Sequence, residues 1–190
     1  MNGPPFSPQI QMVKRPPPYQ ILKVLEDGGD NIPFTLWSGG RDGVTPTLST
    51  SYSVRGGHSI ILATDASLDP SDISDFANDK DRGDLSAYAH EWVYGWFYFP
   101  ALALAHLNTY VQLLMGLYDY SKYIYTNFNP ASLVVGWNIL KMDLDNPTVN
   151  SGAFGFTSTS KLRLEYDALA GNTADFEIYL GYLAFVRPLT

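Results

Sequence analysis

The sequence predicts an all-β protein, an antiparallel β-sandwich with an extended, proline-rich N-terminal arm. Three observations support this prediction. Roughly ten short stretches alternate apolar and polar residues with a period of two, the side-chain period of a strand. Glycine, proline, asparagine and aspartate separate these stretches at short intervals, as they do between the strands of sandwiches and barrels. The 190 residues, 45% of them hydrophobic, are enough for one domain with a sizeable core.

Residues 1–18 form the predicted arm, ahead of a sandwich domain over residues 19–190. Six prolines fall in this arm, and such a density disfavours both helix and sheet and favours an extended, polyproline-like chain. The arm also carries four larger apolar side chains: Phe6, Ile10, Met12 and Val13. We expect them to anchor the arm on a neighbouring subunit or a larger assembly, and the alternative is a solvated, disordered tail.

In the first half of the chain, apolar runs and turn residues define five expected strands and one long loop. The strands cover residues 19–25, 34–37, 45–54, 58–64 and 91–99. Glycine-containing turns follow the first three of them. Residues 65–89 are polar and rich in aspartate, and we expect a long loop there, of the kind that is functional or mobile.

In the second half, we expect a helical turn and five further strands. The helical turn covers 101–107, and the strands cover 109–118, 121–128, 136–144, 161–166 and 176–186. The clearest alternation lies in 136–144, which an Asp-Asn-Pro turn closes, and it predicts a strand buried mainly on one face. The last stretch is apolar on both faces, so we expect it in the centre of its sheet.

Aromatic residues are densest in the strand expected over 91–99. Alternation places Val93, Phe97 and Phe99 on one face. The other face carries four rings: Trp92, Tyr94, Trp96 and Tyr98. Flat rings bury a large area at little entropic cost and can stack on sugar rings, so this set is the candidate ligand-binding face. The alternative is that these rings pack beneath the aspartate-rich loop or against another subunit.

Composition argues against several classes of function. A formal net charge of -7 with 12 basic residues argues against a nucleic-acid partner, because phosphate backbones are bound by clustered Lys and Arg. No apolar run approaches the ~20 residues of a membrane-spanning helix, and the N-terminus shows no signal-peptide pattern. The lack of cysteine removes disulfides, thiolate nucleophiles and cysteine-ligated zinc, and slightly favours a reducing compartment.

No catalytic constellation stands out in the sequence. The three histidines, His58, His90 and His106, lack the spacing of zinc ligands, and nucleophile elbows and Gly-rich phosphate loops are absent. Residues 79–84 crowd carboxylates but depart from the EF-hand spacing, so we expect a solvated acidic loop rather than a calcium site. A glycosidase needs two carboxylates across a cleft. Nothing marks such a pair, and we expect no enzyme.

Several short motifs follow one another in the order of a known fold. They are an acidic-glycine turn at 25–28, a Ser/Thr-rich strand and glycine hairpin leading to an apolar strand over 51–62, an aromatic strand ending in proline at 96–100, a Gly-Trp-Asn strand over 136–144, a basic alternating strand over 161–166 and a last apolar strand over 176–185. Over residues 20–187 this order resembles the β-jelly roll of the carbohydrate-binding-module type, which is also found in phage virion proteins. The resemblance implies a jelly-roll fold more than a function.

The resemblance also implies a calcium site, because many family members hold a structural calcium ion between the early acidic turn and an aspartate in the last strand. Glu26 and Asp27 are present here and are the candidate metal ligands, but the last strand reads Leu180-Gly181-Tyr182 and offers no carboxylate. Calcium takes about six to eight oxygen ligands. We therefore expect no cofactor, with calcium as the alternative.

These observations favour a non-catalytic structural or interaction protein. The leading hypothesis is a bacteriophage virion component (head decoration, fibre or tail attachment), motivated by the jelly roll, the apolar arm and the lack of a visible export signal. Its expected partners are other copies of itself, in a homo-oligomer, and other virion proteins, in a virion made in the host cytoplasm. The alternative is a carbohydrate-binding module that recognises glycans through the aromatic face, and an enzyme ranks third.

Overall fold

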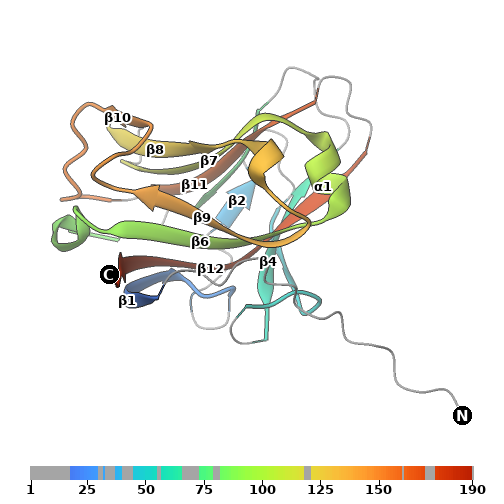
Figure 1. The fold of residues 1–190 in the computed structure, drawn as a ribbon, viewed down its shortest axis with the longest axis horizontal. Helices are drawn as coiled ribbons and strands as arrows, with labels where there is room; N and C mark the ends of the chain where they lie inside the picture. The colour runs from blue at the N-terminus through green and yellow to red at the C-terminus, as the bar shows by residue number, and fades with distance from the viewer. Residues whose placement is uncertain are drawn as a thin grey trace, which may run out of the picture.

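The computed structural model of the protein describes residues 18–29, 32, 37–39, 45–54, 57–65, 73–78, 82–117, 121–159, 161–169 and 174–189. Over these residues the chain forms two antiparallel sheets that lie face to face (Figure 1). The predicted all-β sandwich is confirmed. Residues 1–17 of the predicted arm, with Phe6, Ile10, Met12 and Val13, lie outside the described residues.

Each sheet has six strands. Sheet A contains, in spatial order, β3 (Thr47–Ser49), β4 (Ser59–Thr64), β12 (Phe176–Pro188), β6 (Trp92–Phe99) and β9 (Gly136–Asp143), with β1 (Tyr19–Glu26) also paired to β12. Sheet B contains β10 (Val149–Ser151), β8 (Tyr123–Phe128), β7 (Leu107–Gly116), β11 (Lys161–Ala168), β5 (Ile73–Asn78) and β2 (Trp37–Gly39). Most neighbouring strands are distant in sequence, so chain order alone does not give the pairing.

Strand β12 lies at the centre of sheet A. Its first half pairs with β4, its second half pairs with β1, and β6 pairs along its other edge. Its side chains are buried on both faces from Ile178 to Val186. The prediction of a central strand that is apolar on both faces is confirmed.

The core lies between the sheets and is filled from alternate positions of each strand. Strand β6 contributes Val93, Phe97 and Phe99, all fully buried on one face as predicted, and β11 contributes Leu164 and Tyr166. A fully buried apolar side chain of this kind stabilises the fold by about 1.5–3 kcal/mol. The intervening positions of the same strands face outward, away from the core.

The expectation of one long loop over residues 65–89 is wrong. The segment contains strand β5 and the short 3-10 helix η2 (Ser86–Tyr88). Strand β5 pairs with β11 over its whole length, and Phe76 is fully buried in the core. The strand is short and flanked by aspartates, which hide its apolar character in the sequence. The short strand β10 likewise lies where no strand was predicted.

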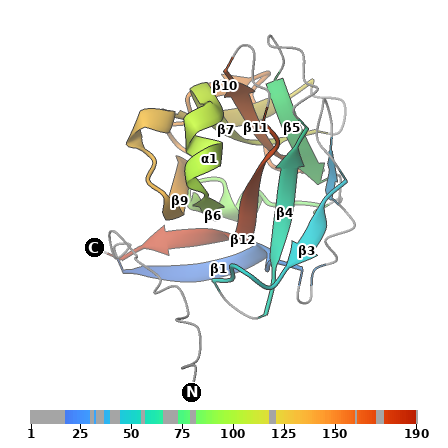
Figure 2. The same cartoon turned by 90° about the vertical axis from the view of Figure 1, so that its right-hand side faces the viewer.

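Helix α1 (Ala101–His106) confirms the helical turn expected after the aromatic strand. It carries the chain from β6 in sheet A to β7 in sheet B (Figure 2). Ala103 of the helix is buried, and the ring of His106 stacks on Phe176 with a centroid separation of 6.1 Å. In the part of the chain that the structure describes, no helix has the length and apolarity needed to cross a membrane.

Candidate functional site

The four rings predicted as a ligand-binding face lie on the outer face of sheet A. They alternate along β6 with the core residues Val93 and Phe97, so they point away from the core. Other rings from sheet A and from the segment after β3 pack beside them. We call the following set the aromatic layer: Trp92, Tyr94, Trp96 and Tyr98 with Tyr19, Tyr52, Trp137 and Tyr182.

The middle of the aromatic layer is closed to solvent. Tyr94 is 2% exposed and Trp96 is 5% exposed. Tyr19 of β1 lies against both, with ring centroids 5.5 Å from Tyr94 and 5.7 Å from Trp96. Tyr182 meets Trp96 edge-on at 5.4 Å. These two central rings pack against neighbours of their own chain and present almost no area to a ligand.

The two ends of the aromatic layer are half-buried and keep accessible ring surface. Trp92 lies at one end. At the other end Tyr98 stacks on Tyr52 at 3.8 Å between centroids and meets Trp137 edge-on at 5.6 Å. Burial and the neighbouring Tyr52 raise the pKa of Tyr98, so its hydroxyl stays protonated at neutral pH. Ligand binding by this layer stays a prediction, and Trp92 and Tyr98 are the predicted residues placed to carry it.

A second candidate surface lies on the outer face of sheet B, where no ligand-binding residue was predicted from the sequence. We call the following set the polar face: Tyr110 and Gln112 of β7, Tyr123, Tyr125 and Asn127 of β8, and Arg163, Glu165 and Asp167 of β11. These positions alternate with core residues of the same strands. The strand register places Glu165 opposite Gln112, and Gln112 opposite Asn127. Three polar side chains therefore form a row across three strands.

The polar face is held by its own hydrogen bonds. Glu165 is 9% exposed and Gln112 is 7% exposed. The hydroxyl of Tyr110 donates to Oε1 of Glu165 at 2.8 Å, and the guanidinium of Arg163 forms an ion pair with Oε2. Gln112 Nε2 donates to Asn127 Oδ1 at 3.0 Å. Burial and the Glu165 carboxylate raise the pKa of Tyr110 well above its ordinary value, so this hydroxyl remains a donor.

Two tyrosine rings stand beside this network. Tyr123 and Tyr125 are nearly parallel, with an interplanar angle of 12° and centroids 6.0 Å apart, and both are half-buried. Gly116 lies opposite Tyr123, and a Cβ at that position would lie 2.9 Å from the Tyr123 Cβ. The available sequence signal is alternation: Tyr123, Tyr125 and Asn127 share one face of β8. Parallel rings next to fixed donors and acceptors can hold the apolar faces and the hydroxyls of sugars.

The candidate metal ligands Glu26 and Asp27 lie at the end of β1. Glu26 is 0% exposed. Its Oε1 accepts the backbone N–H of Asp27 at 2.9 Å and of Gly29 at 3.2 Å, and its Oε2 accepts the indole N–H of Trp37 at 2.7 Å. Asp27 Oδ1 accepts the backbone N–H of Ile32 at 3.0 Å. N–H donors thus occupy the oxygens that a cation would need.

The last strand does pass this turn, as the resemblance implies. A Cβ at Gly28, whose φ is +79°, would lie 2.6 Å from the carbonyl oxygen of His58 and 3.0 Å from that of Gly181. Gly181 brings no carboxylate to this place. Among the described residues, no three His, Cys, Asp or Glu side chains gather as metal ligands. The acidic turn therefore does not fit a calcium ion.

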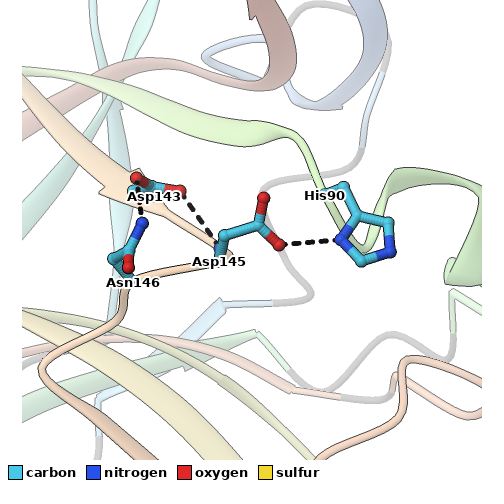
Figure 3. Close-up of polar contacts among 4 residues, drawn as sticks. All are labelled: His90, Asp143, Asp145 and Asn146. Carbon is cyan, nitrogen blue, oxygen red and sulfur yellow. Dashed lines mark hydrogen bonds and ion pairs between the residues drawn. The ribbon is translucent and has the colours of Figure 1, made fainter.

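His90 lies at the surface beside the turn that follows β9. Its Nδ1 is 2.7 Å from Oδ1 of Asp145 (Figure 3). The backbone N–H of Asp145 and the side-chain amide of Asn146 each donate to the Asp143 carboxylate at 3.0 Å. The hydrogen bond with Asp145, and its charge, raise the pKa of His90 above its ordinary value of 6.5. This group of side chains holds the turn that the Asp-Asn-Pro sequence predicts.

No protein-family model matches the chain, and no curated protein matches it. Solved structures match it instead. A structure of carbohydrate-binding modules from the β-sandwich superfamily is 11% identical, has a TM-score of 0.59, and covers 84% of this chain and 60% of that chain. The CBM27-1 module of Caldicellulosiruptor saccharolyticus, in complex with mannohexaose, is 13% identical with a TM-score of 0.54 and covers 90% of this chain and 99% of that chain. An exo-β-agarase is 11% identical with a TM-score of 0.56 and covers 90% of this chain and 25% of that chain.

The similarity is one of fold. This chain spans 60% of the first structure, 25% of the agarase and 99% of the CBM27-1 chain. Similarity at these identities shows a common fold and carries no residue-by-residue correspondence. It confirms the β-sandwich of the carbohydrate-binding-module type that the motif order resembles.

Proposed function

We propose that the protein is a non-catalytic carbohydrate-binding module that binds a glycan on the polar face of sheet B. The observation that carries this proposal is the juxtaposition of the parallel rings of Tyr123 and Tyr125 with the nearly buried Gln112 and Glu165. A pyranose presents C–H groups on its faces and hydroxyls at its edges, so it needs aromatic rings and fixed polar groups side by side. The fold similarity to carbohydrate-binding modules, one of them in complex with mannohexaose, supports the same function.

The aromatic layer supports glycan binding less well than the polar face. Its central rings are covered, and its accessible rings lie at opposite ends of β6. Lys141 Nζ lies over the Tyr94 ring, 5.2 Å from its centroid, and the Tyr179 hydroxyl donates to Glu177. The layer therefore offers fewer fixed hydrogen-bonding groups beside its accessible rings. It is the second candidate surface for the same function.

Binding to a glycan array, followed by isothermal titration with the retained glycan, tests this proposal. Tyr125→Ala is expected to weaken binding by about tenfold or more, as the loss of an interface hot spot does. Trp92→Ala, on the opposite sheet, is the matched control and is expected to leave the affinity unchanged. Far-ultraviolet circular dichroism confirms that each variant is folded. The reverse pattern would move the site to the aromatic layer, and a wild-type chain that no glycan retains would contradict the proposed function.

The solved structures support this proposal better than the hypothesis of a bacteriophage virion component. Self-association and virion partners stay predictions, and light scattering of the full chain measures the first of them. The expectation that the protein is not an enzyme also stays a prediction, since one similar structure belongs to an exo-β-agarase. Assaying the retained glycan for hydrolysis tests it directly.

A further inference from the structure

Glu26 places a carboxylate in the interior of the sandwich. It is fully buried, and the hydrogen bonds described above come from neutral groups: two backbone N–H groups and the indole of Trp37. Burial raises the pKa of Glu26, and these hydrogen bonds act in the opposite direction. A buried carboxylate is costly to ionise unless a positive charge balances it. The structure must therefore be searched for that charge.

Strand pairing brings a guanidinium to the same end of the sandwich. Trp37, whose indole binds Glu26, lies directly opposite Asn78 in the pairing of β2 with β5. Asn78 Oδ1 in turn accepts a hydrogen bond from Arg82 Nη2 at 3.1 Å. Residues directly opposite in an antiparallel pair have Cβ atoms about 4.5–5.5 Å apart. The side chains that hold the carboxylate and the guanidinium are thus immediate neighbours.

The backbone that carries Arg82 is fixed to a second segment. The N–H of Arg82 donates to the carbonyl of Thr159 at 2.8 Å, and the N–H of Thr159 donates to the carbonyl of Gly83 at 3.1 Å. Leu85 N–H donates to the carbonyl of Phe156 at 2.7 Å. Burial lowers the pKa of Arg82 to about 10, and the charge of Glu26 acts to raise it. Arg82 is therefore protonated at neutral pH and close enough to Glu26 to feel its charge.

We propose that Arg82 supplies the internal positive charge that balances Glu26, in place of the calcium ion that the motif order implies. The acidic turn does not fit calcium, because N–H donors occupy Glu26 and the last strand presents Gly181 there. A cation built into the chain makes the fold independent of calcium. This inference concerns stability and stands apart from the proposed glycan site.

Thermal unfolding of the full chain tests the proposal in two arms. In the first arm, the wild-type melting temperature is expected to be the same in millimolar calcium chloride and in EDTA. In the second arm, Arg82→Met is expected to lower the melting temperature by about 5–10 °C, because removing one partner of a buried pair is strongly destabilising and partial exposure reduces the effect. Lys122→Met removes an exposed positive charge and is expected to change the melting temperature little.

A double-mutant cycle with Glu26→Gln isolates the pair. The variant with both substitutions is expected to lose less than the sum of the two single losses, because each single variant leaves one charge without its counterpart. Strictly additive losses would overturn the proposal, and so would a wild-type melting temperature that calcium raises and EDTA restores. If Arg82→Met does not fold, Arg82→Lys, which keeps the charge, is expected to fold, and the calcium arm still decides the question.

Discussion

Replacing Gly181 with alanine tests how the aromatic layer packs on the central strand. A Cβ there would lie 2.6 and 2.8 Å from two ring carbons of Trp137 and 2.8 Å from a methyl group of Val54. Trp137 is itself packed against Tyr98, so the ring cannot withdraw freely. Overpacking of this kind costs about 1–3 kcal/mol, and the reduced freedom of the unfolded chain offsets about 0.4–1 kcal/mol of it. The net loss is about 1–2 kcal/mol, or a fall in melting temperature of about 2–8 °C for a chain of this size.

Differential scanning calorimetry and tryptophan emission measure this effect together. Gly155→Ala is the matched control, because a Cβ at Gly155 has no heavy atom within 4 Å, and its melting temperature is expected to stay the same or rise slightly. Gly181→Ala is also expected to alter tryptophan emission, since it displaces the ring of Trp137. Equal melting temperatures for the two variants would refute the packing described here.

Three further predictions concern the cover of the aromatic layer, the core and the surface turn. Tyr19→Ala is expected to lower stability by about 1–2 kcal/mol and to increase acrylamide quenching of tryptophan emission, and unchanged quenching would show that Tyr19 is not the cover. Phe76→Ala is expected to cost about 3–5 kcal/mol in urea unfolding, and a cost below ~1 kcal/mol would place β5 outside the core. The pKa of His90 in the folded protein is raised, so its contact with Asp145 is complete below about pH 6.5 and is lost as the pH rises through the folded-state pKa. A proton NMR titration is expected to show a lower His90 pKa in Asp145→Asn, and equal values would contradict the pairing.

Two-residue periodicity predicted the strands whose alternation is strong. Strands β6, β9, β11 and β12 all lie where the pattern placed them, because one buried face imposes that pattern on the sequence. Strand β5 escaped prediction, since its six residues stand between aspartates and carry few apolar side chains. The pairing of β11 with β7 and β5 also escaped, because pairing depends on contacts between segments far apart in the chain.

The candidate surfaces show the same limit. Alternation placed the four rings of β6 together on the face opposite Val93 and Phe97, and the structure has them there. Alternation within one strand gave no sign that Tyr19 of β1 lies over the central rings. The polar face combines β7, β8 and β11, and each of these strands alone resembles an ordinary solvent-facing edge. Only their register brings Glu165, Gln112 and Asn127 into one row.

Backbone amide NMR of the isotopically labelled chain, titrated with a glycan selected from the array, tests the central claim most directly. A glycan bound on the polar face is expected to shift the amide signals of β7, β8 and β11 and to leave those of β1, β6 and β9 in place. Shifts confined to β1, β6 and β9 would contradict the account, because they would place the ligand on the aromatic layer.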